Sequence, residues 1–418
     1  MMKRILSLSL IVLLLLPLCL TFTACGKDGG ETTTLYVYNW GEYISDGSEE
    51  SLDVNAAFEE WYYATTGKKV EVNYSTYSSN ESMYAKLSSG SVNYDVVVPS
   101  DYMIERMIKE DMLAELNFDN IPSIGNIHPD FYGETAKHNY YDPEGKYSVP
   151  YLYGMIGIIY NTTMVDKADI GSWDLMWNKN GKGVKDYTGN ILQFNNSRDA
   201  FGTAQYYMGN VENVNSKNEA DWRKALELLK EQKPFLQGYV MDEIFNKMEN
   251  GSAAIAAYYA GDFLSMYENN PDLDFYYPSE GTNLYVDAMC IPKSSQNKEI
   301  AEAYIEFMLT EAPAIANAEY TYYASPNMKV RDNEEYKEYM NSIKEGGYDL
   351  MYDTDTVKTS SYENLDAEQL IMLNNLWEEL KSDIDVGLTI YVICGVILTI
   401  LLGGGLFLGI RKRIRDRY

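Results

Sequence analysis

The sequence has few of the residues on which most catalytic and metal-binding sites depend. Its 418 residues include four cysteines and two histidines. His128 and His138 lie in a region that contains Pro and Gly, and their spacing matches no metal-ligand pattern. We therefore expect no metal or other cofactor, and no nucleophile activated by histidine.

The cysteines are too scattered for a disulfide framework. Cys19 and Cys25 belong to the N-terminal segment and Cys394 to a C-terminal apolar run, which leaves Cys290 alone between them. A single cysteine inside an apolar strand is more often a core residue than a nucleophile.

Basic residues are scarce outside the two ends of the chain. Seven of the 34 Lys and Arg residues, but one of the 62 Asp and Glu residues, lie before residue 26 or after residue 410. The middle then has 27 basic and 61 acidic residues, a net charge of −34. Such a field repels nucleic acid and attracts small cations, although solubility outside a cell would also favour it.

Apolar runs beside the terminal basic residues predict membrane targeting. Residues 1–25 have a basic start, an apolar run and a lipobox-like Thr-Ala-Cys ending, so we expect a secretory signal with Cys25 as the lipidation site, or else an uncleaved signal anchor. Residues 26–34 form a polar tether. The 23 uncharged residues 388–410 can span a bilayer, and the basic tail 411–418 marks the cytoplasmic side.

Between these ends, strand and helix patterns alternate, which is typical of an α/β fold with a mostly parallel sheet. The length allows two lobes. We expect the chain to cross between them near 148–151 and to return near 275–278. The predicted bounds are 35–150 and 279–310 for the first lobe, and 151–278 and 311–383 for the second.

The stretch 284–292 predicts a buried strand with Asp287 in its middle. Burial of an ionised carboxylate costs several kcal/mol at order of magnitude unless a cation or several donors meet it. Either Lys or Arg pairs with Asp287, or a cationic ligand does. The alternative is a structural Asp that accepts hydrogen bonds from local amides.

Several motifs occur in order along the chain: Leu-Tyr-Val-Tyr-Asn-Trp-Gly-Glu-Tyr (35–43), the segments 74–87 and 94–102, Tyr-Ser-Val-Pro-Tyr (147–151), Asn-Asn-Ser-Arg-Asp-Ala-Phe (195–201), Leu-Tyr-Val-Asp-Ala-Met-Cys-Ile-Pro (284–292) and Tyr-Tyr-Ala-Ser-Pro-Asn (322–327). Over residues 35–382 this order resembles the substrate-binding component of spermidine/putrescine ABC transporters.

The resemblance implies a two-lobed periplasmic-binding-protein-like fold that closes on a linear polyamine and delivers it to separate permease and ATPase subunits. It implies no enzymatic activity. Carried over by motif, the ligand-binding residues are Trp40, Tyr43, Ser100, Tyr102, Asn196, Asp199, Tyr259, Tyr285, Asp287, Tyr323 and Glu363. Asn196 stands where many relatives have Asp, and Asp199 where they have Glu, so the choice between spermidine and putrescine stays open.

Other functions remain possible from the residues alone. A sensor for another small cationic solute would need no transport partners. A binder of sugars or anions would need fewer carboxylates at strand ends, or Arg and Lys in their place. A secreted enzyme could use Asp199 and Asp287 as an acid/base pair, as glycosidases do. One membrane span cannot form a permease.

Overall fold

The computed structural model describes residues 32–178 and 185–382, which form two compact units. The first unit holds the described residues up to Tyr153 together with Val286–Ser342. The second holds Gly154–Tyr285 and the described residues from Ile343 onward. The predicted signal, tether, membrane span and basic tail lie outside the described residues. Within residues 32–178 and 185–382, no helix is both long and apolar enough to cross a membrane.

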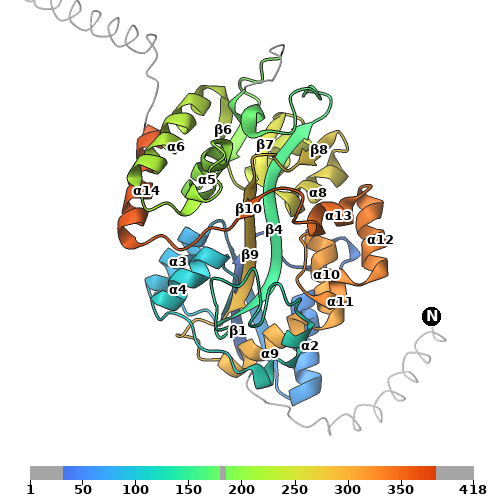
Figure 1. Cartoon of the computed structure of the whole chain (residues 1–418). Helices are drawn as coiled ribbons and strands as arrows, with labels where there is room; N and C mark the ends of the chain where they lie inside the picture. The colour runs from blue at the N-terminus through green and yellow to red at the C-terminus, as the bar shows by residue number, and fades with distance from the viewer. Residues whose placement is uncertain (1–31, 179–184, 383–418) are drawn as a thin grey trace, which may run out of the picture. The chain divides into compact units, whose positions relative to one another are not determined.

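Two long strands pass from one unit into the other (Figure 1): β4 (Ser148–Asn161) and β9 (Thr282–Cys290). Both are buried along their whole length. We expected the chain to return to the first lobe near 275–278. The structure corrects this expectation, because β8 (Leu273–Tyr276) pairs antiparallel with β4 inside the second unit. The chain returns within β9, where the boundary between the units lies between Tyr285 and Val286.

The sheet of the first unit has the strand order β2-β1-β3-β9. β1 (Thr33–Trp40) pairs in parallel with β2 (Val70–Tyr77) and with the short β3 (Val96–Val97), whereas β3 meets β9 in antiparallel orientation. Parallel neighbours place their carboxyl ends at one edge of the sheet, where the segments after β1 and β3 begin.

Helices of the first unit start and stop at capping residues that the sequence contains. In α2 (Val54–Thr66), Asp53 accepts the N–H of Ala56 at 2.9 Å, and Gly67 ends the helix with φ of 71°. Ser79 caps the next helix through the N–H of Ser82. The remaining helices are α3 (Asn80–Ser88), α4 (Asp101–Lys109), α9 (Lys298–Met308), α10 (Glu311–Thr321), α11 (Met328–Arg331) and α12 (Glu334–Ile343).

Residues 311–342 belong to the first unit, not to the second lobe in which we expected them. Asn317 of α10 accepts the backbone N–H of Ser45 at 3.0 Å, and Asn327 donates to the carbonyl of Leu309 at 2.8 Å. The bond between Asn317 and Ser45 joins segments far apart in the sequence, and the sequence patterns do not contain such contacts.

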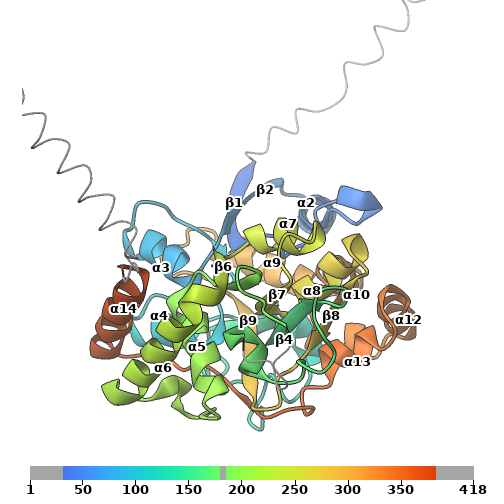
Figure 2. The same cartoon turned by 90° about the horizontal axis from the view of Figure 1, so that it is seen from above.

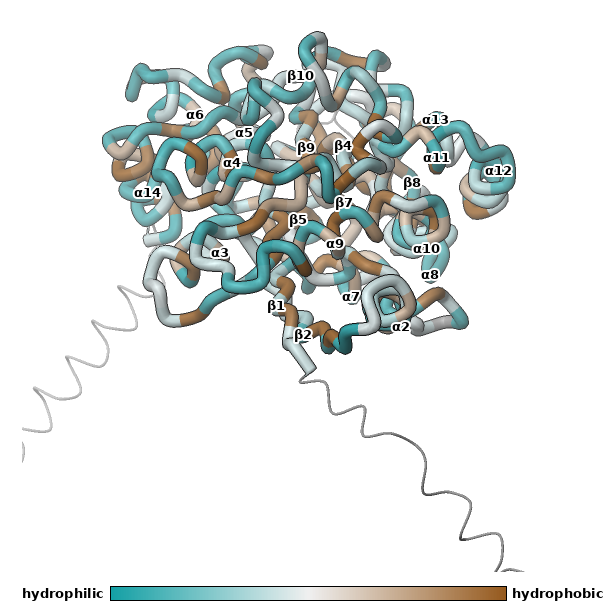
Figure 3. Tube along the Cα trace, turned by 90° about the horizontal axis from the view of Figure 1, so that it is seen from below, coloured by the Kyte–Doolittle hydropathy of each residue, from teal (hydrophilic) through white to brown (hydrophobic). Residues whose placement is uncertain are grey.

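The sheet of the second unit has the order β4-β7-β5-β6, with β8 beside β4. β5 (Ile191–Phe194) pairs in parallel with β6 (Leu236–Val240) and β7 (Ile255–Tyr259), and β10 (Thr359–Ser360) pairs with β9. In Figure 3 the strand β5 is among the hydrophobic parts of this unit, in keeping with its full burial. The strand β7 is buried except at Tyr259.

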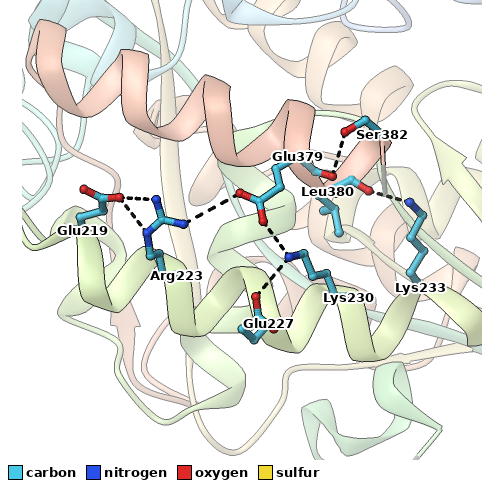
Figure 4. Close-up of polar contacts among 8 residues, drawn as sticks. All are labelled: Glu219, Arg223, Glu227, Lys230, Lys233, Glu379, Leu380 and Ser382. Carbon is cyan, nitrogen blue, oxygen red and sulfur yellow. Dashed lines mark hydrogen bonds and ion pairs between the residues drawn. The ribbon is translucent and has the colours of Figure 1, made fainter. Parts of the chain in front are cut away.

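Helices around this sheet are α5 (Ser197–Tyr207), α6 (Glu219–Gln232), α7 (Glu243–Glu249), α8 (Ala260–Asn269), α13 (Gly347–Tyr352) and α14 (Ala367–Ser382). Figures 1 and 2 both show α14 beside α6. Glu379 of α14 meets Lys230 at 2.7 Å and Arg223 at 3.9 Å (Figure 4), and Lys233 donates to the carbonyl of Leu380 at 2.6 Å. Exposed pairs stabilise little, so the buried Leu side chains of α14 contribute most of its attachment.

Candidate ligand-binding site

The expected ligand-binding residues fall into two clusters, one in each unit. The first cluster, on the first unit, consists of Trp40, Tyr43, Ser100, Tyr102, Asp287 and Tyr323. The second cluster, on the second unit, consists of Asn196, Asp199, Tyr259, Tyr285 and Glu363. The residues of each cluster come from strands, helix starts and loops of its own unit.

Asp287 lies in the interior of β9 with 4% of its surface exposed. Its Oδ2 accepts the hydroxyl of Tyr43 at 2.7 Å, and its Oδ1 accepts the hydroxyl of Ser100 at 2.6 Å. Both donors come from other segments of the unit, unlike the local amides of a structural Asp. Hydroxyl groups stabilise a carboxylate but leave its net charge in place.

A small polar network holds Ser100 against Asp287. The two residues form an isolated antiparallel bridge. Asn80 accepts the backbone N–H of Ser100 at 3.1 Å and donates to its hydroxyl at 3.0 Å and to the hydroxyl of Tyr102 at 3.1 Å. Tyr102 in turn donates to Glu81 at 2.9 Å. Asn80 was not among the ligand-binding residues predicted from the sequence, so sequence reasoning missed this network.

Aromatic rings lie around Tyr43, which bonds the same carboxylate. Tyr43 meets Tyr323 edge to face with 4.9 Å between ring centroids, and meets Tyr151 at 5.7 Å. The indole N–H of Trp40 donates to the carbonyl of Val98 at 3.0 Å, which orients the ring at the end of β1. The cluster therefore combines one charge, several hydroxyl groups and ring faces, a set that suits an alkyl ammonium ion.

A second carboxylate, Asp101, lies next to Asp287 and was not predicted. It is the first residue of α4 and is 1% exposed. Its oxygens accept the N–H of Tyr102 at 2.7 Å and that of Val286 at 3.3 Å, and Tyr140 also bonds it. Burial raises the pKa of Asp101 to about 8, and the charge of Asp287 acts in the same direction. Sequence alone gave no signal, because an Asp at a helix start is ordinarily a solvated cap.

In the second cluster, Asp199 lies in the first turn of α5 and is 8% exposed. Asn196 caps this helix by accepting the N–H of Asp199 at 2.8 Å, and its side-chain amide donates to the Asp199 carboxylate at 2.7 Å. Tyr259 donates its hydroxyl to the same oxygen at 2.7 Å. Burial raises the pKa of Asp199, and the Tyr259 and Asn196 hydrogen bonds oppose this rise.

Arg198 and Tyr362 complete the second cluster, and sequence reasoning missed both. Arg198 is buried, donates to the carbonyls of Val214 at 2.8 Å and Glu363 at 3.0 Å, and lies 4.5 Å from the ring centroid of Tyr362. The charge of Arg198 and the hydroxyl of Tyr362 both favour ionised Asp199, lowering its pKa against the effect of burial. Buried Asp199 thus has a cation close behind it.

Tyr285 and Tyr362 each pack closely against a glycine. A Cβ at Gly154 would lie 2.6 Å from the Tyr285 hydroxyl, and one at Gly202 would lie 2.0 Å from that of Tyr362. Both tyrosines therefore require glycine at the neighbouring position. Tyr285 meets Tyr259 edge to face at 5.3 Å.

Glu363 contacts the second cluster through its backbone. Its N–H donates to Asn215 at 2.8 Å, its carbonyl accepts from Arg198, and the residue is exposed. The preceding Tyr362, not the Glu363 carboxylate, is the side chain that reaches Asp199.

The structure also shows where the residue types used in metal and thiol chemistry lie. Within residues 32–178 and 185–382, no group of three or more His, Cys, Asp or Glu residues is placed to hold a metal ion. Cys290 is fully buried at the end of β9, and burial raises the pKa of its thiol well above the ordinary value. The thiol is therefore a core group.

Comparisons with known proteins identify similar solute-binding proteins. A family model for bacterial extracellular solute-binding proteins matches residues 55–343. The spermidine/putrescine-binding periplasmic protein of Salmonella typhimurium is 30% identical over 302 residues, covering 72% of this chain and 80% of that protein. Its counterpart from Escherichia coli is 28% identical over 366 residues, covering 87% and 96%. The solved structure of the spermidine/putrescine ABC transporter substrate-binding protein PotD from Streptococcus pneumoniae has a TM-score of 0.64 and 31% identity, covering 84% of this chain and 98% of that one.

Proposed function

The chain belongs to the family of bacterial extracellular solute-binding proteins, and from this premise we propose that it captures a polyamine, spermidine or putrescine, for import by an ABC transporter. The observation that carries the proposal is Asp287, a buried carboxylate met by the hydroxyls of Tyr43 and Ser100 in an aromatic cluster. The relatives named above, which bind spermidine and putrescine, support the same ligand class.

The chemistry of a polyamine matches the two clusters. Each ammonium group can form charge-assisted hydrogen bonds of roughly 1.5–3 kcal/mol, and aromatic faces add about 0.5–2 kcal/mol by cation–π contact. The methylene spacers can pack on the same rings. Two or three such contacts, less the entropic cost of association, are consistent with micromolar affinity, about −8 kcal/mol.

The same arrangement argues against catalysis on the ligand. Asp287 and Asp199 both accept tyrosine hydroxyls, and each belongs to a cluster that suits cation binding. The ligand is therefore bound and released unchanged.

Binding experiments test the ligand class directly. Calorimetry on residues 26–386 should show heats of binding for spermidine, putrescine or both, and none for a neutral sugar. Binding of the sugar without either polyamine would reject the proposal. A cell that lacks the gene should also lose polyamine uptake, whereas a sensor with no transport role would bind the polyamine and leave uptake unchanged.

For the ends of the chain we keep the sequence-based proposal: Cys25 is lipidated, 388–410 spans the membrane, and the binding domain lies on the extracytoplasmic face. The protein would then act with separate permease and ATPase subunits and with no nucleic acid. A tag placed after Tyr418 should resist protease added to intact cells while the binding domain is cut. Digestion of the tag from outside would reverse this orientation.

A further inference from the structure

Asp101 and Asp287 lie side by side because of how α4 starts. Ser100 forms a backbone bridge with Asp287, and the next residue, Asp101, turns its carboxylate to the backbone N–H of Val286. Two buried carboxylates are thus held at one point of the first unit, one by hydroxyl groups and the other by backbone amides.

The groups around Asp101 offer hydrogen bonds but no positive charge. Within residues 32–178 and 185–382, Asp101 forms no ion pair with Lys, Arg or His. Around Asp101 and its neighbours, the titratable groups are Asp287 and Cys290 of β9, Tyr77 of β2, Tyr102 of α4, Tyr140, Tyr141 and Asp142 of the loop before β4, and Tyr43, which bonds Asp287. None of these carries a positive charge in any protonation state.

Building on the proposed function, we propose that Asp101 is a positioning residue of the first cluster that releases a proton to solvent when an ammonium group of the ligand binds Asp287. In the empty protein Asp101 is protonated, so the first cluster does not carry a second negative charge. The arriving cation attracts both carboxylates, so the O–H bond of Asp101 breaks and the proton leaves to bulk water. The net charge of the site then changes little on binding.

The local hydrogen bonds suit both forms of Asp101. The N–H groups of Tyr102 and Val286 point at its oxygens and favour the ionised form. The hydroxyl of Tyr140 can accept a hydrogen bond from the protonated form or donate one to the ionised form. Ionisation therefore requires only the rotation of one hydroxyl group.

The expected pH dependence follows from the direction of the shift. With a pKa of about 8 in the empty protein, roughly nine-tenths of the molecules carry the proton at pH 7 and about one-tenth at pH 9. Binding should release close to one proton at pH 7, where the amines of the polyamine already carry their protons and take up none. Affinity should rise with pH, by up to about tenfold per unit below pH 7.5, since low pH favours the protonated form that the ligand must displace.

Calorimetry with spermidine on the full chain in detergent, at pH 7 in buffers of different ionisation enthalpy, measures the released proton. The dependence of the observed enthalpy on buffer should indicate about 0.9 proton for the wild type and none for Asp101→Asn. The matched control is Asp95→Asn, another buried Asp, which bonds Tyr36, Ser295 and Asn297. It should keep the proton release of the wild type.

The outcomes are distinct. Failure of the wild type to bind any polyamine would reject the proposed function and this inference together. Binding with less than about 0.1 proton released at pH 7 would reject the inference alone. Proton release that persists in Asp101→Asn would assign the proton to another group and would also reject it. The wild-type proton count is decisive even if Asp101→Asn fails to fold.

Discussion

The two clusters hold the same kind of group in opposite electrostatic surroundings. Asp287 and Asp199 are both buried carboxylates that accept a tyrosine hydroxyl at 2.7 Å. Behind Asp287 lies another acid, Asp101, whereas beside Asp199 lies the buried cation Arg198. The first cluster therefore contains two acids that attract a cationic ligand, whereas in the second cluster Arg198 lowers the Asp199 pKa and opposes part of the effect of burial.

The electrostatic difference between the clusters predicts different contributions to binding: charge attraction in the first cluster, and fit to the shape of the ligand in the second. A buried carboxylate that binds the ligand cation loses much when that cation is removed, because its burial is then less compensated. A carboxylate beside Arg198 loses less, and its contribution depends more on hydrogen-bond geometry and ring contacts. We expect the first cluster to dominate affinity and the second to dominate the choice among polyamines.

The largest effect is expected for Asp287→Asn, which keeps the side-chain shape and removes the charge. Binding of spermidine should weaken by roughly 2–5 kcal/mol, about 30-fold to several thousand-fold. The melting temperature without ligand should stay equal or rise, because the empty protein loses a buried charge. Calorimetry and thermal melts measure both.

The opposite pattern would change the assignment of Asp287. A sharp fall in the melting temperature of the empty protein, with affinity within about threefold of the wild type, less than 1 kcal/mol, would make Asp287 a core hydrogen-bonding residue. The charge contrast between the clusters would then have no functional meaning.

Asp199→Asn should have a smaller effect on binding. Because Arg198 already compensates part of the Asp199 charge, we expect a loss of about 1–3 kcal/mol, roughly 5-fold to 150-fold, in titrations with spermidine. An equal or larger loss than that of Asp287→Asn would show that Arg198 does not screen this carboxylate from the ligand.

Tyr362→Phe tests the donor that sequence reasoning missed. The substitution keeps the ring over Arg198 and removes a hydroxyl that helps to lower the pKa of Asp199. Affinity should fall by about 0.5–1.5 kcal/mol, roughly 2-fold to 12-fold. An unchanged ratio of spermidine to putrescine affinity would weaken the view that the second cluster sets selectivity.

The smallest effect is expected for Glu363→Gln, which is the matched control for Tyr362→Phe. Glu363 is exposed and is held by its backbone, so removal of its charge should change affinity by less than about twofold. A loss of tenfold or more would restore Glu363 as a ligand-binding carboxylate.

Local patterns in the sequence predicted much of the fold. The apolar spacing from Val54 to Tyr62 followed by Gly67 predicts a helix, which the structure shows as α2. The apolar run 191–194 predicts a strand, which the structure shows as β5. The motif order from 35 to 382 also indicated the family that the comparisons confirm. The bounds of the two units could not be predicted from local patterns. Residues 311–342 join the first unit through contacts between distant segments, such as Asn317 with Ser45.

For the site, the sequence by itself determined that Asp287 is buried, since a carboxylate amid apolar strand residues has little alternative. It also supplied the aromatic and hydroxyl side chains at the strand ends. Only the tertiary structure decided that Asp101 lies behind Asp287 and Arg198 beside Asp199, and that Tyr362 rather than Glu363 reaches the second carboxylate. The physical reason is that electrostatic surroundings depend on distances between segments far apart in the chain, which periodicity and motif order do not contain.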